Sequence, residues 1–222
     1  MLRRAFVVGG TGTVGSAVVR ELVRREIPTT YTHFRSEAVL EGATAVRVDL
    51  RDPVSAQAAF EAQPFDIAIY CAGVSAGLSL AEIDLAMWNE AVAVNTTGPF
   101  LLCQVVAKRA KPCDVVLVGG VDRAQSLPLP AHFAATQGAL PTLAMAVAHE
   151  VGRVGIRVNV VALGPLEGGI SQGLAARRRK DYETFSALRR PGKPEEAARV
   201  IAWLAVENAF IQGKVISANG GI

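Results

Sequence analysis

The chain has 222 residues, of which 50% are hydrophobic and 19% are charged. A chain of this length and composition can bury one substantial core, so we expect residues 1–222 to form a single domain. The formal net charge of +3 is too small to indicate binding to nucleic acid. No apolar run reaches the roughly 18 to 20 residues of a membrane span, and no signal-type segment is present. We therefore expect a soluble, cytoplasmic protein without a membrane partner.

Short apolar segments alternate with longer segments of helical periodicity along the whole chain. The expected strands cover residues 4–8, 29–33, 45–49, 67–72, 115–119, 156–163 and 214–218. The expected helices lie near residues 15–26, 53–62, 85–110, 132–153 and 195–207. This alternation predicts an α/β fold, namely a doubly wound, Rossmann-type sheet of about seven mostly parallel strands with helices on both faces. Residues 165–194 have no clear element and follow the end of a strand, so we expect a mobile lid over the substrate.

Two local features add to this outline. The three cysteines, Cys71, Cys103 and Cys113, show no metal-ligand spacing, and an odd number in a cytoplasmic chain indicates reduced thiols. We expect no metal site. A basic run at residues 177–180, "RRRK", is either a solvated helix face or a landing site for an acidic carrier protein or a phosphorylated substrate.

A glycine-rich turn follows the first expected strand. Gly9, Gly12 and Gly15 stand three residues apart in "VVGGTGTVGSAV", between that strand and the first helix. Such glycines permit a tight turn, let a pyrophosphate approach the backbone and let the helix pack on the strand. The second expected strand ends at His33 and is followed by Arg35, with no acidic residue to accept the ribose hydroxyls of NAD. The sequence therefore predicts a dinucleotide site that prefers NADP(H) to NAD(H).

With these residues placed, the chain resembles the short-chain dehydrogenase/reductase family over its whole length, and in particular its 3-ketoacyl reductase branch. The resemblance rests on the glycine turn, on "CAG" at 71–73, on "VAVNTTGPF" around Asn95, on "GIRVNVVALGPL" and on "GKVISANGG". It implies cofactor contacts at Gly9, Thr11, Gly12, Thr13, Val14, Gly15, His33, Arg35, Asp49, Leu50, Cys71, Ala72, Gly73, Gln137, Pro165 and Leu166. It also implies a dimer or tetramer in which the long helices pair across the interface.

The catalytic positions of the family hold different residues here. In "AHFAATQGAL", Phe133 stands at the position of the family's tyrosine and Gln137 at that of its lysine, while Gly120 stands at that of its serine. Only Asn95 keeps the family's residue. Phenylalanine has no exchangeable proton, glutamine has no charge and glycine has no hydroxyl, so the proton-transfer groups are missing. The resemblance thus implies a degenerate catalytic site.

Three functions remain open at this stage. The first is a non-catalytic subunit that binds NADP(H) without turnover and partners an active reductase of the same family. The second is an active reductase with another proton donor, for which His132, Asp122 and Thr136 are the nearby candidates, while Tyr182 could reach in from the lid. The third is a non-redox enzyme or a dinucleotide sensor. For His132 an interface or surface position is favoured over a catalytic one, and for Tyr182 a packing role is favoured.

Overall fold

The computed structural model describes residues 3–36, 38–120 and 129–222. The described residues form one seven-stranded sheet in the order β3-β2-β1-β4-β5-β6-β7, and every pair of neighbours is parallel. Its strands are β1 (Ala5–Val8), β2 (Thr29–His33), β3 (Ala43–Arg47), β4 (Ile67–Tyr70), β5 (Cys113–Gly119), β6 (Ile156–Leu163) and β7 (Val215–Ala218). The predicted doubly wound, Rossmann-type sheet is confirmed, and it is entirely parallel.

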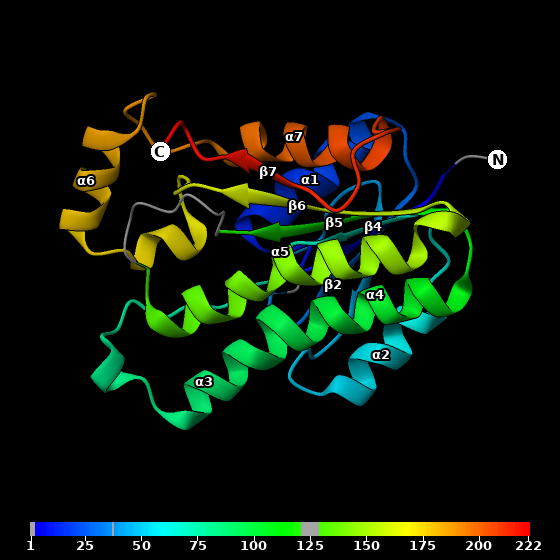
Figure 1. Ribbon diagram of the computed structural model, residues 1–222, viewed down its shortest axis with the longest axis horizontal. Coiled ribbons are helices and arrows are strands. Elements are labelled where there is room, and N and C mark those ends of the chain that lie inside the picture. Colours follow the sequence, from blue (N-terminus) through cyan, green and yellow to red (C-terminus); the bar gives the residue numbers. More distant parts are fainter. Residues whose placement is uncertain (1–2, 37, 121–128) are drawn as a thin grey trace.

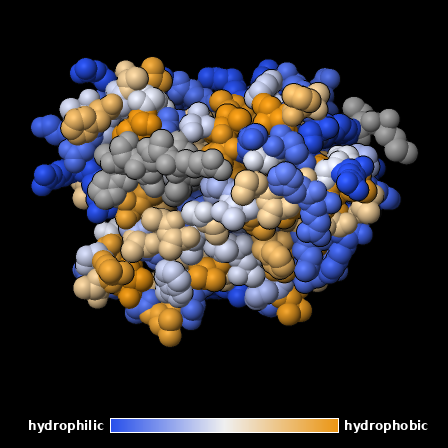
Figure 2. All heavy atoms as spheres, viewed as in Figure 1, coloured by the Kyte–Doolittle hydropathy of each residue, from blue (hydrophilic) through white to orange (hydrophobic). Residues whose placement is uncertain are grey.

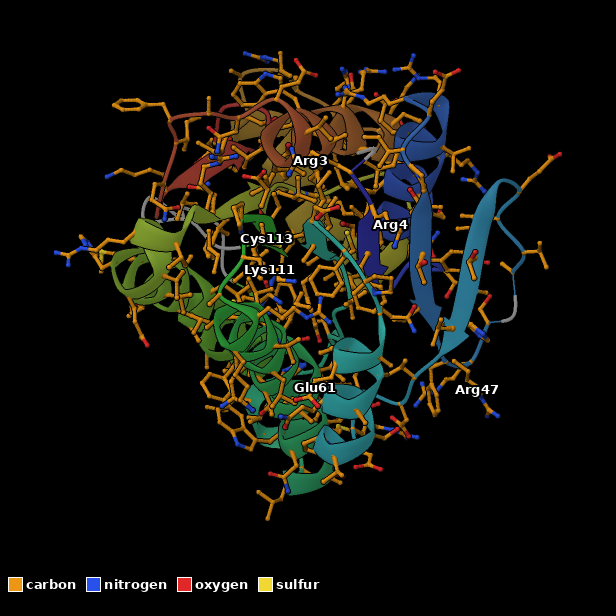
Figure 3. All side chains as sticks on the ribbon, turned by 90° about the vertical axis from the view of Figure 1, so that its right-hand side faces the viewer. Arg3, Arg4, Arg47, Glu61, Lys111 and Cys113 are labelled. Carbon is orange, nitrogen blue, oxygen red and sulfur yellow. The ribbon has the colours of Figure 1, made fainter. Side chains whose placement is uncertain are left out.

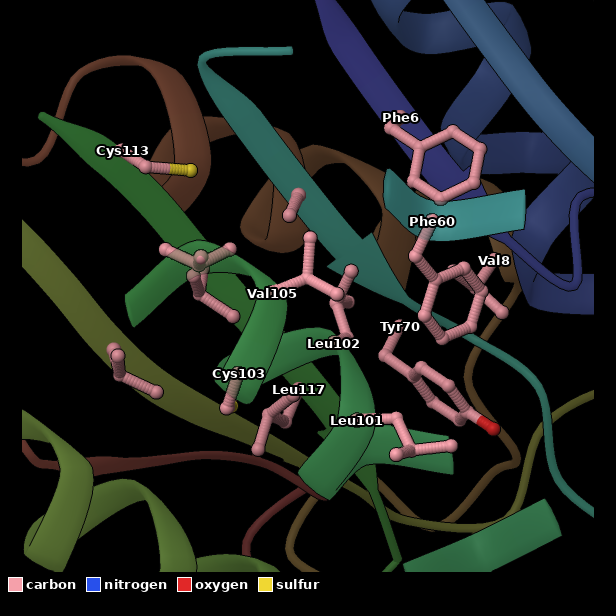
Figure 4. Packing of buried hydrophobic residues seen from close by; sticks show 14 of the residues in the cluster. Phe6, Val8, Phe60, Tyr70, Leu101, Leu102, Cys103, Val105, Cys113 and Leu117 are labelled. Carbon is pink, nitrogen blue, oxygen red and sulfur yellow. The ribbon is translucent and has the colours of Figure 1, made fainter. Parts of the chain in front are cut away.

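Helices cover both faces of the sheet (Figure 1). Helices α1 (Thr13–Arg24) and α7 (Pro194–Val206) pack together on one face, while α2 (Pro53–Ala62), α4 (Gly98–Arg109) and α5 (Ala131–Val151) lie on the other. Successive strand residues point to opposite faces. Phe6 and Val8 of β1 therefore pack with Phe60 of α2 (Figure 4). Ala5 and Val7 pack toward α1 and α7. Burial on both faces explains why these strands are apolar without alternation.

The expected helix at 85–110 is divided into three parts. Helix α3 (Leu85–Val92) leads into a π-helical turn, η2 (Ala93–Thr97), which leads into α4. The Tyr70 hydroxyl donates a 2.6 Å hydrogen bond to the carbonyl of Val94, and Pro99 has no N–H to offer the preceding turn. These two features account for a local change of helical hydrogen bonding, which is a common form of insertion within an α-helix.

The segment 165–194 contains regular structure, contrary to the prediction from sequence. A 3-10 helix, η4 (Gly169–Gly173), is followed by α6 (Ala176–Phe185), which lies beyond the carboxyl ends of the strands (Figure 1). The buried Tyr182 attaches α6 to the last strand's loop, because its hydroxyl donates a 2.8 Å hydrogen bond to the carbonyl of Asn219. Between Ala176 and Phe185, its two terminal residues, the rest of α6 is polar, so the helix lacks the apolar periodicity that would have revealed it. Tyr182 therefore has the packing role that we favoured.

The third strand also differs from expectation. Strand β3 lies two residues earlier than predicted, so Asp49 follows the strand instead of ending it. Figure 3 shows that Arg3 and Arg4 lie far from Arg47, which is on the outer strand β3. Within the described residues, no helix has the length and apolar character needed to cross a membrane.

Candidate dinucleotide site

A cavity of about 600 Å³ opens at the carboxyl edge of the sheet. It is formed by the segments that follow all seven strands, together with η4. Most of the residues predicted to contact a cofactor line it: Gly9, Thr11, Gly12, Thr13, Val14, His33, Arg35, Asp49, Leu50, Cys71, Ala72, Gly73, Gln137, Pro165 and Leu166. Gly120 and Phe133 line it as well, whereas Gly15 and Asn95 do not.

The glycine turn leaves room for a ligand close to the backbone. Gly9 has φ +81°, and a Cβ there would come within 2.7 Å of the backbone of Ala72. Gly15 is buried against the carbonyl of Gly9, so its absence from the cavity wall reflects its packing between α1 and β1. Helix α1 begins at Thr13 after an N-cap, Gly12, that makes no side-chain capping bond. The amides of Gly9, Gly10 and Gly12 are bonded within the protein, so the first amides of α1 are the ones that fit a pyrophosphate at the helix N-terminus.

The loop after β6 closes over this turn. A Cβ at Gly169 would lie 2.9 Å from Oγ1 of Thr13, so η4 packs directly on the start of α1. Ile170 reaches across the cavity, and its Cδ1 lies 3.4 Å from a Cβ placed at Gly73. The backbone N–H of Leu166 donates to Oγ of Ser171 at 3.0 Å. This loop thus covers the end of the cavity where the reacting ring of a dinucleotide would lie.

The opposite end of the cavity contains a residue that the sequence analysis missed. Arg51 lines the cavity and holds Asp49 through two parallel hydrogen bonds of 2.9 and 2.8 Å. The carboxylate of Asp49, one of the implied cofactor contacts, is therefore already paired with Arg51. Arg35 lines the cavity nearby and contacts Glu90 of α3. Arg51 could have been found in the sequence from its place in the same turn as Asp49.

The wall at the catalytic positions is apolar or neutral. Phe133 is buried with its ring against Gly120, where a Cβ would lie 3.1 Å from Cε1 and 3.2 Å from Cζ. Oε1 of Gln137 accepts a 3.2 Å hydrogen bond from the backbone N–H of Gly120. This bond fixes the orientation of the carboxamide and turns Nε2 toward Gly73 and the cavity. A neutral donor thus stands where the family has an ammonium group.

The side chain of Asn95 is hydrogen-bonded on all sides within the protein. Its side chain is fully buried, accepts from the N–H of Val74 at 2.9 Å and donates to the carbonyl of Val74 at 2.9 Å. It also donates to Oγ1 of Thr136 at 3.0 Å. With its carboxamide engaged in this way and outside the cavity wall, Asn95 holds the loop after β4 against η2 and α5.

The candidate proton donors on α5, His132 and Thr136, lie outside the cavity wall. His132 is buried, not on an interface or the surface as we favoured, and its Nε2 accepts from the N–H of Ala76 at 3.0 Å. Burial lowers the pKa of His132, so the neutral imidazole is favoured. Oγ1 of Thr136 donates to the carbonyl of His132 at 2.7 Å. Neither residue lines the cavity, and Asp122 lies outside the described residues.

Cys71 lines the cavity at the position where the family has asparagine. Burial raises the pKa of its thiol well above the ordinary value, so Cys71 is neutral. All three cysteines are free thiols. No group of three or more His, Cys, Asp or Glu side chains that could bind a metal occurs in the part of the chain that the structure describes.

The parallel, doubly wound sheet and the glycine turn at its carboxyl edge define a Rossmann-type α/β protein. The family model described as enoyl-(acyl carrier protein) reductase matches residues 14–222. The chain belongs to the short-chain dehydrogenase/reductase family.

Relatives agree with this assignment over nearly their full lengths. The 3-oxoacyl-[acyl-carrier-protein] reductase MabA of Mycobacterium tuberculosis is 27% identical, with 99% of this chain and 92% of MabA covered. A short-chain dehydrogenase/reductase from Serratia marcescens superposes with a TM-score of 0.88 at 26% identity, covering 99% of this chain and 97% of that one. The structure of BdcA in complex with NADPH gives a TM-score of 0.90 at 25% identity, covering 98% and 93%.

Proposed function

We propose that this protein binds NADP(H) without ordinary ketone reduction and acts as a non-catalytic subunit beside an active reductase of its family. The observation that carries the proposal is the wall formed by Phe133, Gly120 and Gln137 in a cavity whose glycine turn is intact. The complex of BdcA with NADPH supports the choice of cofactor, as does the presence of Arg35 at the cavity's outer end. A dinucleotide bound only by the folded state would stabilise this subunit without turnover.

The missing groups are those that move a proton. Bound NADPH would supply a hydride, but a ketone that accepts it also needs a proton on the resulting alkoxide. A positioned general acid contributes about 10²- to 10⁴-fold to a rate, and a donor to the oxyanion contributes about 10²- to 10³-fold. These factors do not multiply within one catalytic unit. The loss of either one would still leave ketone reduction slow.

Gln137 supports binding without catalysis. Its Nε2 faces the cavity and can donate a hydrogen bond to a ribose hydroxyl of the cofactor. It has no positive charge and therefore cannot lower the pKa of a neighbouring acid in the way that an ammonium group does. Gln137 would therefore orient the cofactor without helping the transfer of a proton to the substrate.

Exposed apolar residues support the oligomeric part of the proposal. Trp88 of α3, Phe100 of α4 and Met145 of α5 have exposed fractions of 39%, 47% and 41%. Large apolar side chains that remain exposed are frequent where subunits associate. We propose a dimer or tetramer that includes an active paralogue, with these helices at the interface.

The basic run on α6 supports a second partner of acidic character. Arg177, Arg179 and Lys180 are exposed, and Arg178 lines the cavity. In Figure 2, hydrophilic side chains gather at the end of the molecule where α6 lies. MabA is named as a reductase of substrates on an acyl carrier protein. An acidic carrier protein approaching α6 would present its substrate arm to the cavity.

An active reductase with a different proton donor is the alternative. The positions of His132 and Thr136 argue against both as that donor, because neither residue lines the cavity and the Thr136 hydroxyl donates to the carbonyl of His132. Asp122 remains as a candidate. If the protein is active, Asp122→Ala should abolish NADPH consumption while His132→Ala leaves it in place. A non-redox enzyme or a dinucleotide sensor has no specific observation in its favour.

Co-expression tests the proposed subunit role. We expect the chain to co-purify with a reductase encoded beside it as a mixed oligomer, and we expect Phe100→Glu to disrupt that oligomer. Val154→Glu is the matched control, because Val154 is also exposed (42%) and lies outside α3, α4 and α5. A strictly homomeric protein that is stable alone and consumes NADPH with a β-ketoacyl thioester would contradict the proposal.

A further inference from the structure

The outer end of the cavity holds two arginines around one aromatic ring. The guanidinium carbon of Arg51 lies 4.7 Å from the ring centroid of Phe34, and that of Arg35 lies 5.9 Å from it. Arg51 is paired with Asp49, and Arg35 is paired with Glu90. All five residues line the cavity. The four charged side chains therefore have a net charge of zero, and they surround the ring of Phe34, which lines the cavity.

The two ion pairs differ in geometry. Arg51 and Asp49 belong to one turn and form a bidentate pair that uses Nε and Nη2 of the guanidinium. Nη1 of Arg51 makes no hydrogen bond to the described residues. This pair lowers the pKa of the Asp49 carboxyl, chiefly through its side-chain hydrogen bond with Arg51. The pair holds the guanidinium in place and leaves three of its five N–H donors, two on Nη1 and one on Nη2, for another ligand.

The pair between Arg35 and Glu90 is looser. It is a single 3.3 Å contact between the loop after β2 and helix α3, and its side chains are 73% and 35% exposed. A single, exposed ion pair of this kind contributes little to stability and is readily exchanged for a stronger partner. A phosphate monoester carries close to two negative charges at neutral pH and offers three acceptor oxygens. Such a group would displace the carboxylate of Glu90 from Arg35.

We propose that Arg51 is a second ligand, beside Arg35, for a phosphate monoester on the adenosine ribose of the cofactor, and that Glu90 competes with this phosphate for Arg35. The proposal rests on the proposed binding of NADP(H). It makes Arg51 and Glu90 specificity-determining residues. A cofactor without this phosphate brings neutral hydroxyls to two carboxylates that are already paired, so it gains less from the same site.

Adenosine 2′,5′-bisphosphate and adenosine 5′-monophosphate form a matched pair of probes, because both lack the nicotinamide end. Isothermal titration measures the ratio of their affinities in each variant. We expect Arg51→Gln to weaken the bisphosphate by about tenfold, the worth of one charge-assisted hydrogen bond, and to change the monophosphate by less than about twofold. We expect Glu90→Gln to tighten the bisphosphate by about threefold with no change for the monophosphate.

Two controls separate a ligand from a structural role. Arg47→Gln removes the same charge from β3 outside the cavity, and it should leave the ratio unchanged. Asp49→Asn breaks the pair with Arg51 but keeps the arginine; since both probes carry the same adenosine, the ratio of their affinities should be at least that of the wild type. If Asp49→Asn lowers the ratio as much as Arg51→Gln, the pair has a structural role and the assignment of Arg51 is wrong. If Glu90→Gln leaves the ratio of the two affinities unchanged, Glu90 does not compete with the phosphate for Arg35.

Titration of the wild type with NADPH distinguishes this proposal from the proposed function. If NADPH binds and Arg51→Gln leaves the ratio of the probes unchanged, the inference about Arg51 fails while the proposed function stands. If the bisphosphate binds in the predicted way but NADPH does not, the phosphate ligands stand and the proposed function fails. If the wild type binds neither, both are wrong.

Discussion

Replacing Gly120, Phe133 and Gln137 by the serine, tyrosine and lysine of the family is the most informative perturbation of the site. Cζ of Phe133 lies 3.2 Å from where a Cβ of residue 120 would be, so a hydroxyl on that ring would project beside the serine position of the family. Phe133→Tyr supplies the acid, and Gln137→Lys supplies the charge that lowers its pKa. We expect the double variant to gain NADPH-dependent reduction of a β-ketoacyl thioester by at least about 100-fold over the wild type.

The third substitution, Gly120→Ser, would crowd the ring of Phe133. A Cβ at Gly120 would meet Cε1 and Cζ of Phe133 at 3.1 and 3.2 Å, which is tighter than ordinary van der Waals contact. Overpacking of this kind costs about 1 to 3 kcal/mol. Gly120→Ser alone should therefore lower the free energy of unfolding by that amount and restore no activity. In the triple variant it should add to the rate once the ring and its hydroxyl have adjusted.

The assay follows the absorbance of NADPH with and without the thioester, alongside a urea denaturation curve for each variant. Cofactor binding is measured in the same samples, so that a loss of binding is not mistaken for a loss of chemistry. The reasoning is refuted if a folded triple variant binds NADPH and remains inactive. It is equally refuted if the wild type already reduces the thioester as fast as the double variant.

Three further predictions concern the framework around the site. Burial lowers the pKa of His132 below its ordinary 6.5, so the unfolded chain binds this proton before the folded chain does as the pH falls. The free energy of unfolding should therefore decline below about pH 6.5. His132→Gln should reduce that decline in denaturation curves measured at several pH values. Asp114 is buried and bonded to Arg3 and Arg157, so Asp114→Asn should cost about 3 kcal/mol in the same measurement, and a loss below about 1 kcal/mol would contradict this. Tyr182→Phe removes the hydrogen bond to Asn219 and should cost about 1 kcal/mol; hydrogen exchange in α6 should then rise, whereas unchanged exchange would mean that α6 is held otherwise.

The sheet could be predicted because the burial of a strand is visible in its own apolar sequence. Strands β1, β4 and β5 are buried on both faces, so their residues are mainly apolar whichever way they point, with Asp114 of β5 as the charged exception. The glycine turn could be predicted for the same reason, because Gly9, Gly12 and Gly15 lie within one short segment of the sequence. These parts of the fold depend on residues that are close together in the sequence.

Features that depend on distant contacts could not be predicted. The π-helical turn depends on Tyr70 meeting the carbonyl of Val94, which are neighbours only after β4 and the helix have packed. Helix α6 has one buried residue, Tyr182, among polar neighbours, so it has no apolar stripe to read. The sequence also placed Asn95 correctly in its motif without showing that its carboxamide is engaged by the backbone of Val74.

The central claim is that the cavity binds NADPH and does not oxidise it. The direct test is to titrate the purified wild-type protein with NADPH, following the fluorescence of the reduced ring, and then to add excess β-ketoacyl thioester to the saturated complex. We predict saturable binding with one NADPH per chain, and no loss of NADPH after the thioester is added. Catalytic consumption of NADPH by the wild-type chain alone would contradict the account.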